Sequence, residues 1–288
     1  MIIDFHTHVF PDKIAPETLR ALSGASNILP STDGTAQGLS RSMEKAGIGL
    51  SVNLPVLTRP SQADRVNDSL LDSYETMLDM GILTFGGMHP GYVGFREKLH
   101  MLAQGGMKGI KLHPAYQKTD LDDPSMMRII DAASQEGLVV LIHAGLDIGI
   151  PGHDYSDLHM ILRVLDEVRP PKMVLAHMGG WQNWEDVGRY LAGADVWLDT
   201  AFSIGKIDAA KKHEDPSGGQ ADEMPCNMEP EAFLSLCRKH GTNRILFGTD
   251  CPWADQHTYV EEIRSLPLSD AQKADILGGN AAKLLALQ

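Results

Sequence analysis

MIIDFHTHVFP, residues 1–11, opens the chain with a short apolar strand that ends in two histidines. Side chains at positions i and i+2 of a strand point the same way, so His6 and His8 can face one point. An open doubly wound sheet is the structural alternative, but it favours a glycine-rich phosphate-binding turn after its first strand. The HTHVFP turn contains no glycine, which favours a closed barrel.

The strand pattern recurs along the chain and alternates with amphipathic helical patterns. The strand segments are brief, apolar and rich in β-branched residues, as parallel strands buried on both faces are. The candidates are Ile2–Phe5, Leu50–Leu54, Ile82–Gly86, Gly109–Leu112, Val139–Ile142, Met173–Ala176, Val196–Leu198 and Ile245–Phe247. Eight strands alternating with helices predict an α/β fold of the (β/α)8 TIM-barrel type, with residues 1–288 as a single domain.

Proline and glycine mark the expected helix ends. Pro124 and Pro230 stand where helices should begin, and Gly137 and Gly241 stand where helices should end. Residues 202–228 form a connection that is long for such a barrel, and loops of this length are usually functional or disordered. We expect this segment to be either a lid over the barrel mouth or a plain surface excursion.

Composition restricts the partners. The formal net charge of -13 argues against nucleic acid, because phosphate binding needs a basic surface. No apolar run approaches the roughly 20 residues that span a membrane, and the MIIDF start does not resemble a secretion signal. Three cysteines make no disulfide framework and fit a reducing compartment. We expect a cytoplasmic protein that acts on a small molecule.

Polar residues follow several of the predicted strands directly. His143 follows VVLI, His177 follows MVLA and Asp250 follows ILFGT. Barrel enzymes keep their active sites at the carboxyl ends of the strands. A single histidine there is more often a hydrogen-bonded structural residue, but five such residues at the same end indicate a shared site. His6, His8, His143 and Asp250 suit Zn²⁺ or another divalent first-row metal such as Mn²⁺.

These motifs resemble the amidohydrolase superfamily. DFHTH near the amino terminus, a histidine after each of strands five and six, and GTD at strand eight occur here in the order of that family. Within it the chain is most similar to the amidohydrolase-2 (amidohydrolase-related) group, which includes aminocarboxymuconate-semialdehyde decarboxylase. The resemblance covers the whole chain, and the HxH motif is specific when it occurs together with the strand-eight aspartate.

The resemblance implies a role for each residue. His6 and His8 match the first-strand ligands, and His143 matches the strand-five ligand. Asp250 matches the strand-eight carboxylate, which binds metal and accepts the proton of the hydrolytic water. His177 matches the strand-six histidine, which either binds a second metal or orients water or substrate.

Strand four leaves two alternatives. Lys111 and His113 point the same way by alternation. Several dinuclear amidohydrolases carry a carboxylated lysine there that bridges two metals. We favour the other alternative, an uncharged or ion-paired lysine that meets a substrate carboxylate, because the related decarboxylase group uses one metal. We therefore expect one divalent ion per chain.

Other motifs are weaker. GMHP, with His89, and TDCPW also resemble TatD-type nucleases, but Lys111 stands where that family carries a glutamate. Trp253 could form a wall of the pocket or pack structurally. Trp181 and Trp184 are interpreted as packing residues at the start of a helix, and Cys251 as structural.

Three functions remain open on these residues. We favour a metal-dependent hydrolase, in which Asp250 takes a proton from metal-activated water, Asp250 or His177 protonates the leaving group, and a C–N, C–O or C–C bond is cleaved. Non-oxidative decarboxylation is the main alternative, and hydrolysis is preferred because no insertion is seen that would build an aromatic-acid pocket. A non-catalytic scaffold with a structural metal is the third. The resemblance also implies a homo-oligomer, most simply a dimer.

Overall fold

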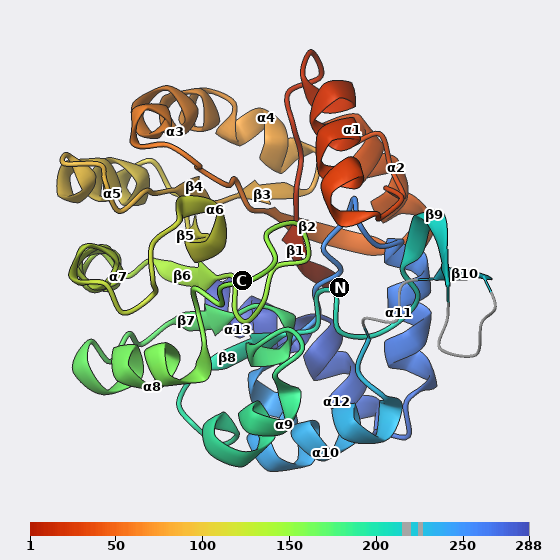
Figure 1. The fold of residues 1–288 in the computed structure, drawn as a ribbon. Helices are drawn as coiled ribbons and strands as arrows, with labels where there is room; N and C mark the ends of the chain where they lie inside the picture. The colour runs from red at the N-terminus through yellow and green to blue at the C-terminus, as the bar shows by residue number, and fades with distance from the viewer. Residues whose placement is uncertain (215–219, 224–226, 288) are drawn as a thin grey trace.

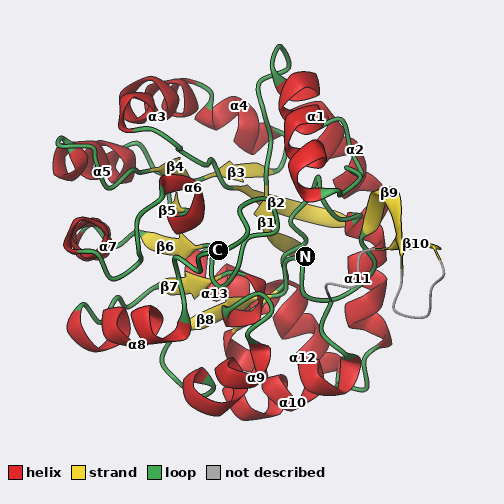
Figure 2. Ribbon diagram, viewed as in Figure 1, coloured by secondary structure: helices red, strands yellow, loops and turns green. Residues whose placement is uncertain are grey.

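The computed structural model describes residues 1–214, 220–223 and 227–287, and within them the chain forms a (β/α)8 TIM barrel. Strands lie at the centre and helices surround them (Figures 1 and 2). The barrel strands are β1 (Ile2–Thr7), β2 (Ile48–Asn53), β3 (Ile82–Thr84), β4 (Gly86–Gly87), β5 (Gly109–Leu112), β6 (Val139–Ile142), β7 (Met173–Leu175), β8 (Trp197–Asp199) and β11 (Ile245–Leu246). The barrel predicted from the sequence is confirmed, and two of its strands have the expected bounds.

The barrel closes where the first strand meets the last. β3 pairs with β2 and β4 pairs with β5, so these two short strands together fill the third position. The N–H of Phe5 donates to the carbonyl oxygen of Phe247 (2.7 Å), and Thr7 bridges to Cys251. The residues that follow β1 and β11 are therefore neighbours although they lie at opposite ends of the chain.

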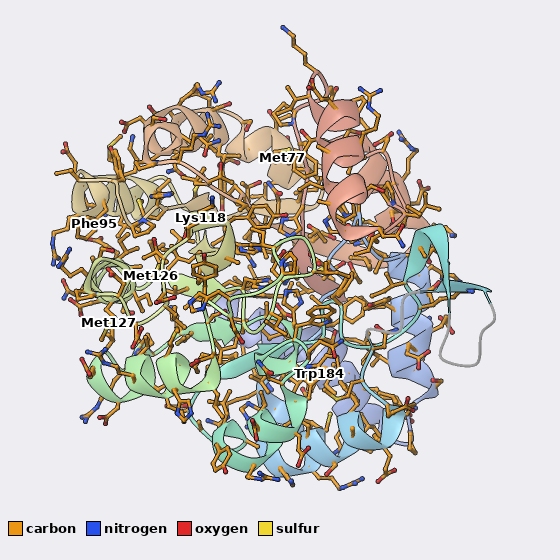
Figure 3. The ribbon with its side chains drawn as sticks, viewed as in Figure 1. Met77, Phe95, Lys118, Met126, Met127 and Trp184 are labelled. Atoms are coloured by element: carbon orange, nitrogen blue, oxygen red, sulfur yellow. The ribbon has the colours of Figure 1, made fainter. Side chains whose placement is uncertain are left out.

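The helices form the outer layer, except for the last, which packs against the barrel interior (Figure 1). They are α1 (Ala15–Ser26), α2 (Ala36–Ala46), α3 (Ala63–Asp72), α4 (Tyr74–Asp79), α5 (Phe95–Gln104), α6 (Pro114–Gln117), α7 (Pro124–Gln135), α8 (Leu158–Glu167), α9 (Trp184–Asp186), α10 (Pro230–His240), α11 (Gln256–Ser265), α12 (Asp270–Ala274) and α13 (Asn280–Leu285). α7 and α10 begin at the predicted prolines. Side chains such as Met126 of α7 fill the layer between helices and strands (Figure 3). The barrel interior forms a second apolar cluster, which α13 joins through Ala281, Leu284 and Leu285.

The long connection after β8 contains an antiparallel pair, β9 (Asp208–Glu214) and β10 (Gln220–Glu223). Ala210 donates its N–H to the carbonyl oxygen of Asn27 (2.8 Å), so β9 lies against the segment that follows α1. The predicted lid 202–228 falls partly outside the described residues, at 215–219 and 224–226. Among the described residues, no helix has the length and apolar character needed to span a bilayer.

Candidate active site

The two histidines of the first strand line a cavity at the carboxyl ends of the strands. Nδ1 of His6 lies 2.8 Å from Asp199 Oδ2, and Nδ1 of His8 lies 2.7 Å from the carbonyl oxygen of Leu54. A carbonyl oxygen only accepts hydrogen bonds, so neutral His8 carries its hydrogen on Nδ1 and keeps a lone pair on Nε2. The carboxylate of Asp199 acts on His6 in the same way, an arrangement that is common behind metal-binding histidines.

Asp250 joins these histidines, and we call His6, His8 and Asp250 the first triad. The backbone of Asp250 is left-handed (φ 69°), and its N–H donates to the carbonyl oxygen of His6 (2.8 Å). Its Oδ1 lies 3.0 Å from His8 Nε2 and 3.4 Å from His6 Nε2. Ligand atoms at bonds of about 2.0–2.2 Å to one ion are themselves about 3.0–3.6 Å apart. The first triad therefore fits a divalent metal ion.

Burial controls the charges of this site. Burial, and after it the positive charge of Lys111, holds the pKa of His6 well below its ordinary value, so the ring is neutral. Neutral imidazole is the form that binds metals. Burial raises the pKa of Asp199, and the backbone N–H of His177 and the charge of Lys111 oppose that rise. A cation at His6 would further favour the ionised carboxylate of Asp199.

His143 and His177 form a hydrogen-bonded pair beside the first triad. His177 Nδ1 lies 2.8 Å from the carbonyl oxygen of Ala201, and its Nε2 lies 3.0 Å from His143 Nδ1. His143 Nε2 in turn lies 3.2 Å from the carbonyl oxygen of Leu146. The two rings and the two carbonyl oxygens form a relay of three contacts, and each contact needs one hydrogen. Two neutral rings supply only two hydrogens, and the carbonyl oxygens at the ends supply none, so one contact lacks a hydrogen. A cation or a proton at His143 would fill the gap.

A second group of potential ligands lies in the same cavity. We call His113, His143 and Asp147 the second triad. Asp147 Oδ2 lies 3.5 Å from His113 Nε2 and 3.8 Å from His143 Nε2. The backbone N–H of Tyr116 donates to His113 Nδ1 over a long 3.5 Å, which places the ring hydrogen of neutral His113 on Nε2, facing Asp147. Burial raises the pKa of Asp147 to about 6.

The ligands expected from the sequence are thus divided between the triads. His6, His8 and Asp250 come together, whereas His143 groups with His113 and Asp147. His177 lies between the two groups, with ring centroids 5.3 Å from His6 and 4.7 Å from His143. The imidazoles therefore form one continuous belt on the cavity floor.

Lys111 stands beside this belt. Its side chain is buried, and its Nζ lies 3.5 Å from His6 Nε2. Burial lowers the pKa of Lys111 to about 8, while the charges of Asp199, Asp250 and Asp147 act in the opposite direction. The protonated amine can attract an anionic group.

The cavity has a volume of about 510 Å³ and combines a polar floor with apolar walls. Trp181, Phe202 and Trp253 form the aromatic part of the wall; Trp181 and Phe202 share a buried apolar cluster with Ile28, and Trp253 packs against that cluster. Trp253 lies on the wall, as one of the two interpretations had it, and Trp181 also lines the cavity. Trp184 lies beside this cluster and donates its Nε1–H to the carbonyl oxygen of His177 (2.9 Å), which fits the packing role (Figure 3).

Two further motif residues lie away from this chemistry. His89 does not line the cavity and accepts a hydrogen bond from the N–H of Gly91 (3.0 Å). Cys251 is buried, and burial raises the pKa of its thiol, which disfavours the nucleophilic thiolate.

Sequence reasoning missed Asp199 and Asp147. Asp199 is the last residue of β8, so the rule that selected the other strand-end residues could have found it. Asp147 lies in an irregular connection after β6, and no spacing in the sequence singles it out.

The chain resembles known proteins in sequence and in structure. A model of the amidohydrolase family matches residues 3–287. An uncharacterised TIM-barrel protein from Bordetella bronchiseptica is similar in structure, with 18% identity, 99% of this chain and 98% of that chain covered, and a TM-score of 0.73. No curated protein sequence matches the chain.

Two further structural neighbours are named as decarboxylases. A dihydroxybenzoic acid decarboxylase from Polaromonas, solved with manganese and 2-nitroresorcinol, shares 15% identity over 99% of this chain and 97% of that chain, with a TM-score of 0.68. A 5-carboxyvanillate decarboxylase from Sphingomonas paucimobilis shares 16% identity over 100% and 99%, with a TM-score of 0.63. At these identities the likeness shows the fold.

Proposed function

The chain belongs to the amidohydrolase family, and from that premise we propose that it is a metal-dependent decarboxylase of small aromatic carboxylic acids. The observation that carries this proposal is the aromatic wall of Trp181, Phe202 and Trp253, which lines the same cavity as the first triad. The preference for hydrolysis rested on the absence of an insertion that could build such a pocket. The connections after α1 and after β8 supply this wall, because Ile28 and Phe202 belong to the same apolar cluster as Trp181, and Trp253 packs against it. The names of the two decarboxylase neighbours support the same choice.

Each part of the floor has a task in this reaction. A divalent ion held by the first triad supplies, when bound, a Lewis acid for substrate oxygens; zinc and manganese both suit these ligands, and we propose one ion per chain. The Lys111 ammonium attracts the substrate carboxylate. The aromatic wall contacts the ring and keeps water away from the reacting carbon.

The reaction consumes one proton. The bond between the ring carbon and the carboxyl carbon breaks, its electron pair stays on the ring carbon, and CO2 leaves. We assign to the Asp250 carboxyl group the transfer of a solvent-derived proton to that carbon. His177 does not suit this task, because burial lowers its pKa to about 4 and its Nδ1 faces the carbonyl oxygen of Ala201. It instead positions His143.

The test measures CO2 release from 2,6-dihydroxybenzoate by manganese- or zinc-loaded protein, in parallel with the consumption of amides and lactones. We expect CO2 release, with deuterium from D2O at the ring carbon. Asp250→Asn should lower the rate about 10²–10⁴-fold, the scale of a general acid. Asp79→Asn, at an exposed position of α4, is the matched control.

Three outcomes would contradict this proposal. Hydrolysed amides or lactones without CO2 would replace it with hydrolysis of a C–N, C–O or C–C bond. No turnover of any substrate by loaded protein would favour the scaffold function. A near-normal rate in Asp250→Asn would remove that residue from the proton transfer.

A further inference from the structure

The cavity extends well beyond the polar floor. A cavity of about 150 Å³ accepts a benzene ring, whereas this one measures about 510 Å³. A one-ring acid would therefore leave most of the volume empty. The remaining space is bounded by side chains of α1, of α3 and of the segment after β2.

One face of α1 forms the first wall of this space. Ile14, Thr18, Leu22 and Ser26 line it, and residues four apart lie on one face of a helix. At 1.5 Å per residue the stripe is about 18 Å long. Within the described part of the chain, Ile14 is 47% exposed, so this end of the stripe opens to solvent.

One face of α3 forms the opposite wall. Its lining residues include Val66, Ser69 and Leu70, which recur at the three- and four-residue spacing of a helix face. Both walls therefore present continuous helix faces to the space between them. We call this space the side channel.

The side channel begins at the first triad. His8 is held by the carbonyl oxygen of Leu54 (2.7 Å), and the N–H of Val9 donates to Asn53 Oδ1 (3.0 Å). Leu54 and the residues that follow it, Pro55, Val56 and Leu57, line the cavity between floor and helices. A ligand bound at the floor thus has an apolar path that leads away from the metal ligands.

We propose that the substrate is an aromatic acid that carries an unbranched alkyl chain, with the acid at the floor and the chain in the side channel. This inference rests on the proposed decarboxylation and specifies its substrate class. The carboxylate and an adjacent oxygen face Lys111 and the first triad, while the chain contacts Leu22 of α1 and Val66 of α3. The lining residues of α1 and α3 include one charged side chain, that of the exposed Arg65. The other lining residues of these two helices are apolar or uncharged, and the stretch between Leu22 and Val66 suits methylene groups.

The test uses 2,6-dihydroxybenzoates with hydrogen, methyl, propyl or pentyl at the ring position opposite the carboxylate. Their dissociation constants from metal-loaded protein are measured by calorimetry, with CO2 release followed in parallel. Affinity should rise about fourfold per methylene, which corresponds to about 0.8 kcal/mol for each buried CH2.

Two variants test where the alkyl chain of the ligand lies. Leu22→Trp and Val66→Trp fill the channel from opposite walls, and each should reduce the ratio of pentyl to unsubstituted affinity at least about tenfold, a few methylenes' worth of contact. The ratio within one variant cancels any general loss of folded protein. Ala21→Trp, at an exposed position of the same helix, should leave the ratio unchanged.

The outcomes separate this inference from the reaction. Affinity that rises with chain length without CO2 supports the channel and overturns the decarboxylation. Equal affinities with CO2 release overturn the channel and keep the decarboxylation. If affinity rises with alkyl chain length as strongly in both tryptophan variants as in the wild type, the alkyl chain does not lie in the side channel.

Discussion

The two triads on the cavity floor contain the same residue types, two histidines and one aspartate, yet they differ in where the ring hydrogens are held. In the first triad, the carbonyl oxygen of Leu54 holds the hydrogen of His8 on Nδ1, so Nε2 faces Asp250 with a lone pair. In the second, the Tyr116 N–H faces His113 Nδ1, so the hydrogen lies on Nε2 and points to Asp147. The residue types alone do not distinguish the two.

The difference teaches that a metal site depends on what lies behind each imidazole. An acceptor behind the ring leaves a lone pair for an ion, and a donor behind it leaves a hydrogen for a carboxylate. We therefore infer that the first triad binds the metal and that the second is a hydrogen-bonded group beside the substrate. His143, which belongs to the relay with His177, can serve either group.

The largest expected effect tests whether the first triad, and not the second, binds the metal. Replacing both histidines in His6→Asn/His8→Asn removes two of the three ligands, so bound metal should fall from about one ion per chain to near zero. His113→Asn is the matched variant in the second triad, and it should keep about one ion. Elemental analysis after dialysis measures both. Stoichiometric metal in the double variant, or its loss in His113→Asn, would reverse the assignment.

Replacing Asp199, which contacts the metal-ligand candidate His6, should have a smaller effect on metal binding. Asp199→Asn leaves all three ligands of the first triad in place but removes the carboxylate 2.8 Å from His6 Nδ1. Metal affinity should fall about 10–100-fold, as for other residues that support a metal ligand. Competition with a chelator measures the affinity, and circular dichroism checks the fold. An unchanged affinity would show that Asp199 supports the barrel and not the metal.

The smallest effect is a pH dependence of stability from the second triad. The pKa of Asp147 is raised to about 6 in the folded protein, so this group stabilises the fold at low pH and loses that contribution as pH rises through 6. Its contribution should fall by about 1 kcal/mol between pH 5 and pH 7.

Urea unfolding at the two pH values measures this contribution. The difference in unfolding free energy between pH 5 and pH 7 should change by about 1 kcal/mol in Asp147→Asn relative to the wild type. Asp79→Asn should keep the wild-type difference. The same pH dependence in Asp147→Asn would mean that the carboxyl group titrates normally.

Much of the barrel could be predicted because parallel strands buried on both faces leave a local record in apolar runs. β5 and β6 begin and end where the runs do. The third strand was expected as one run, but it divides into β3 and β4, which pair with different neighbours. Such a division depends on barrel curvature and leaves no local pattern. The β9–β10 pair was missed because its polar residues show no apolar alternation.

The site was predictable to the same extent. His6, His8 and Asp250 could be found because each lies at or beyond the carboxyl end of a strand, and position in the fold brings them together. Asp147 could not, because a loop residue gains its place only when the connection after β6 turns back over the barrel. The hydrogen positions that separate the triads depend on Leu54 and Tyr116, whose backbone atoms carry no sequence signal.

The seam between β1 and β11 has a consequence for how the protein matures. The first triad joins residues from the start of the chain to one beyond the final barrel strand, so its pocket exists only after synthesis of that strand is complete. Nascent chains that already contain most of the barrel should take up no ion. A metal ion held by the proposed first-triad site would therefore bind late and would favour the state in which the two ends have met.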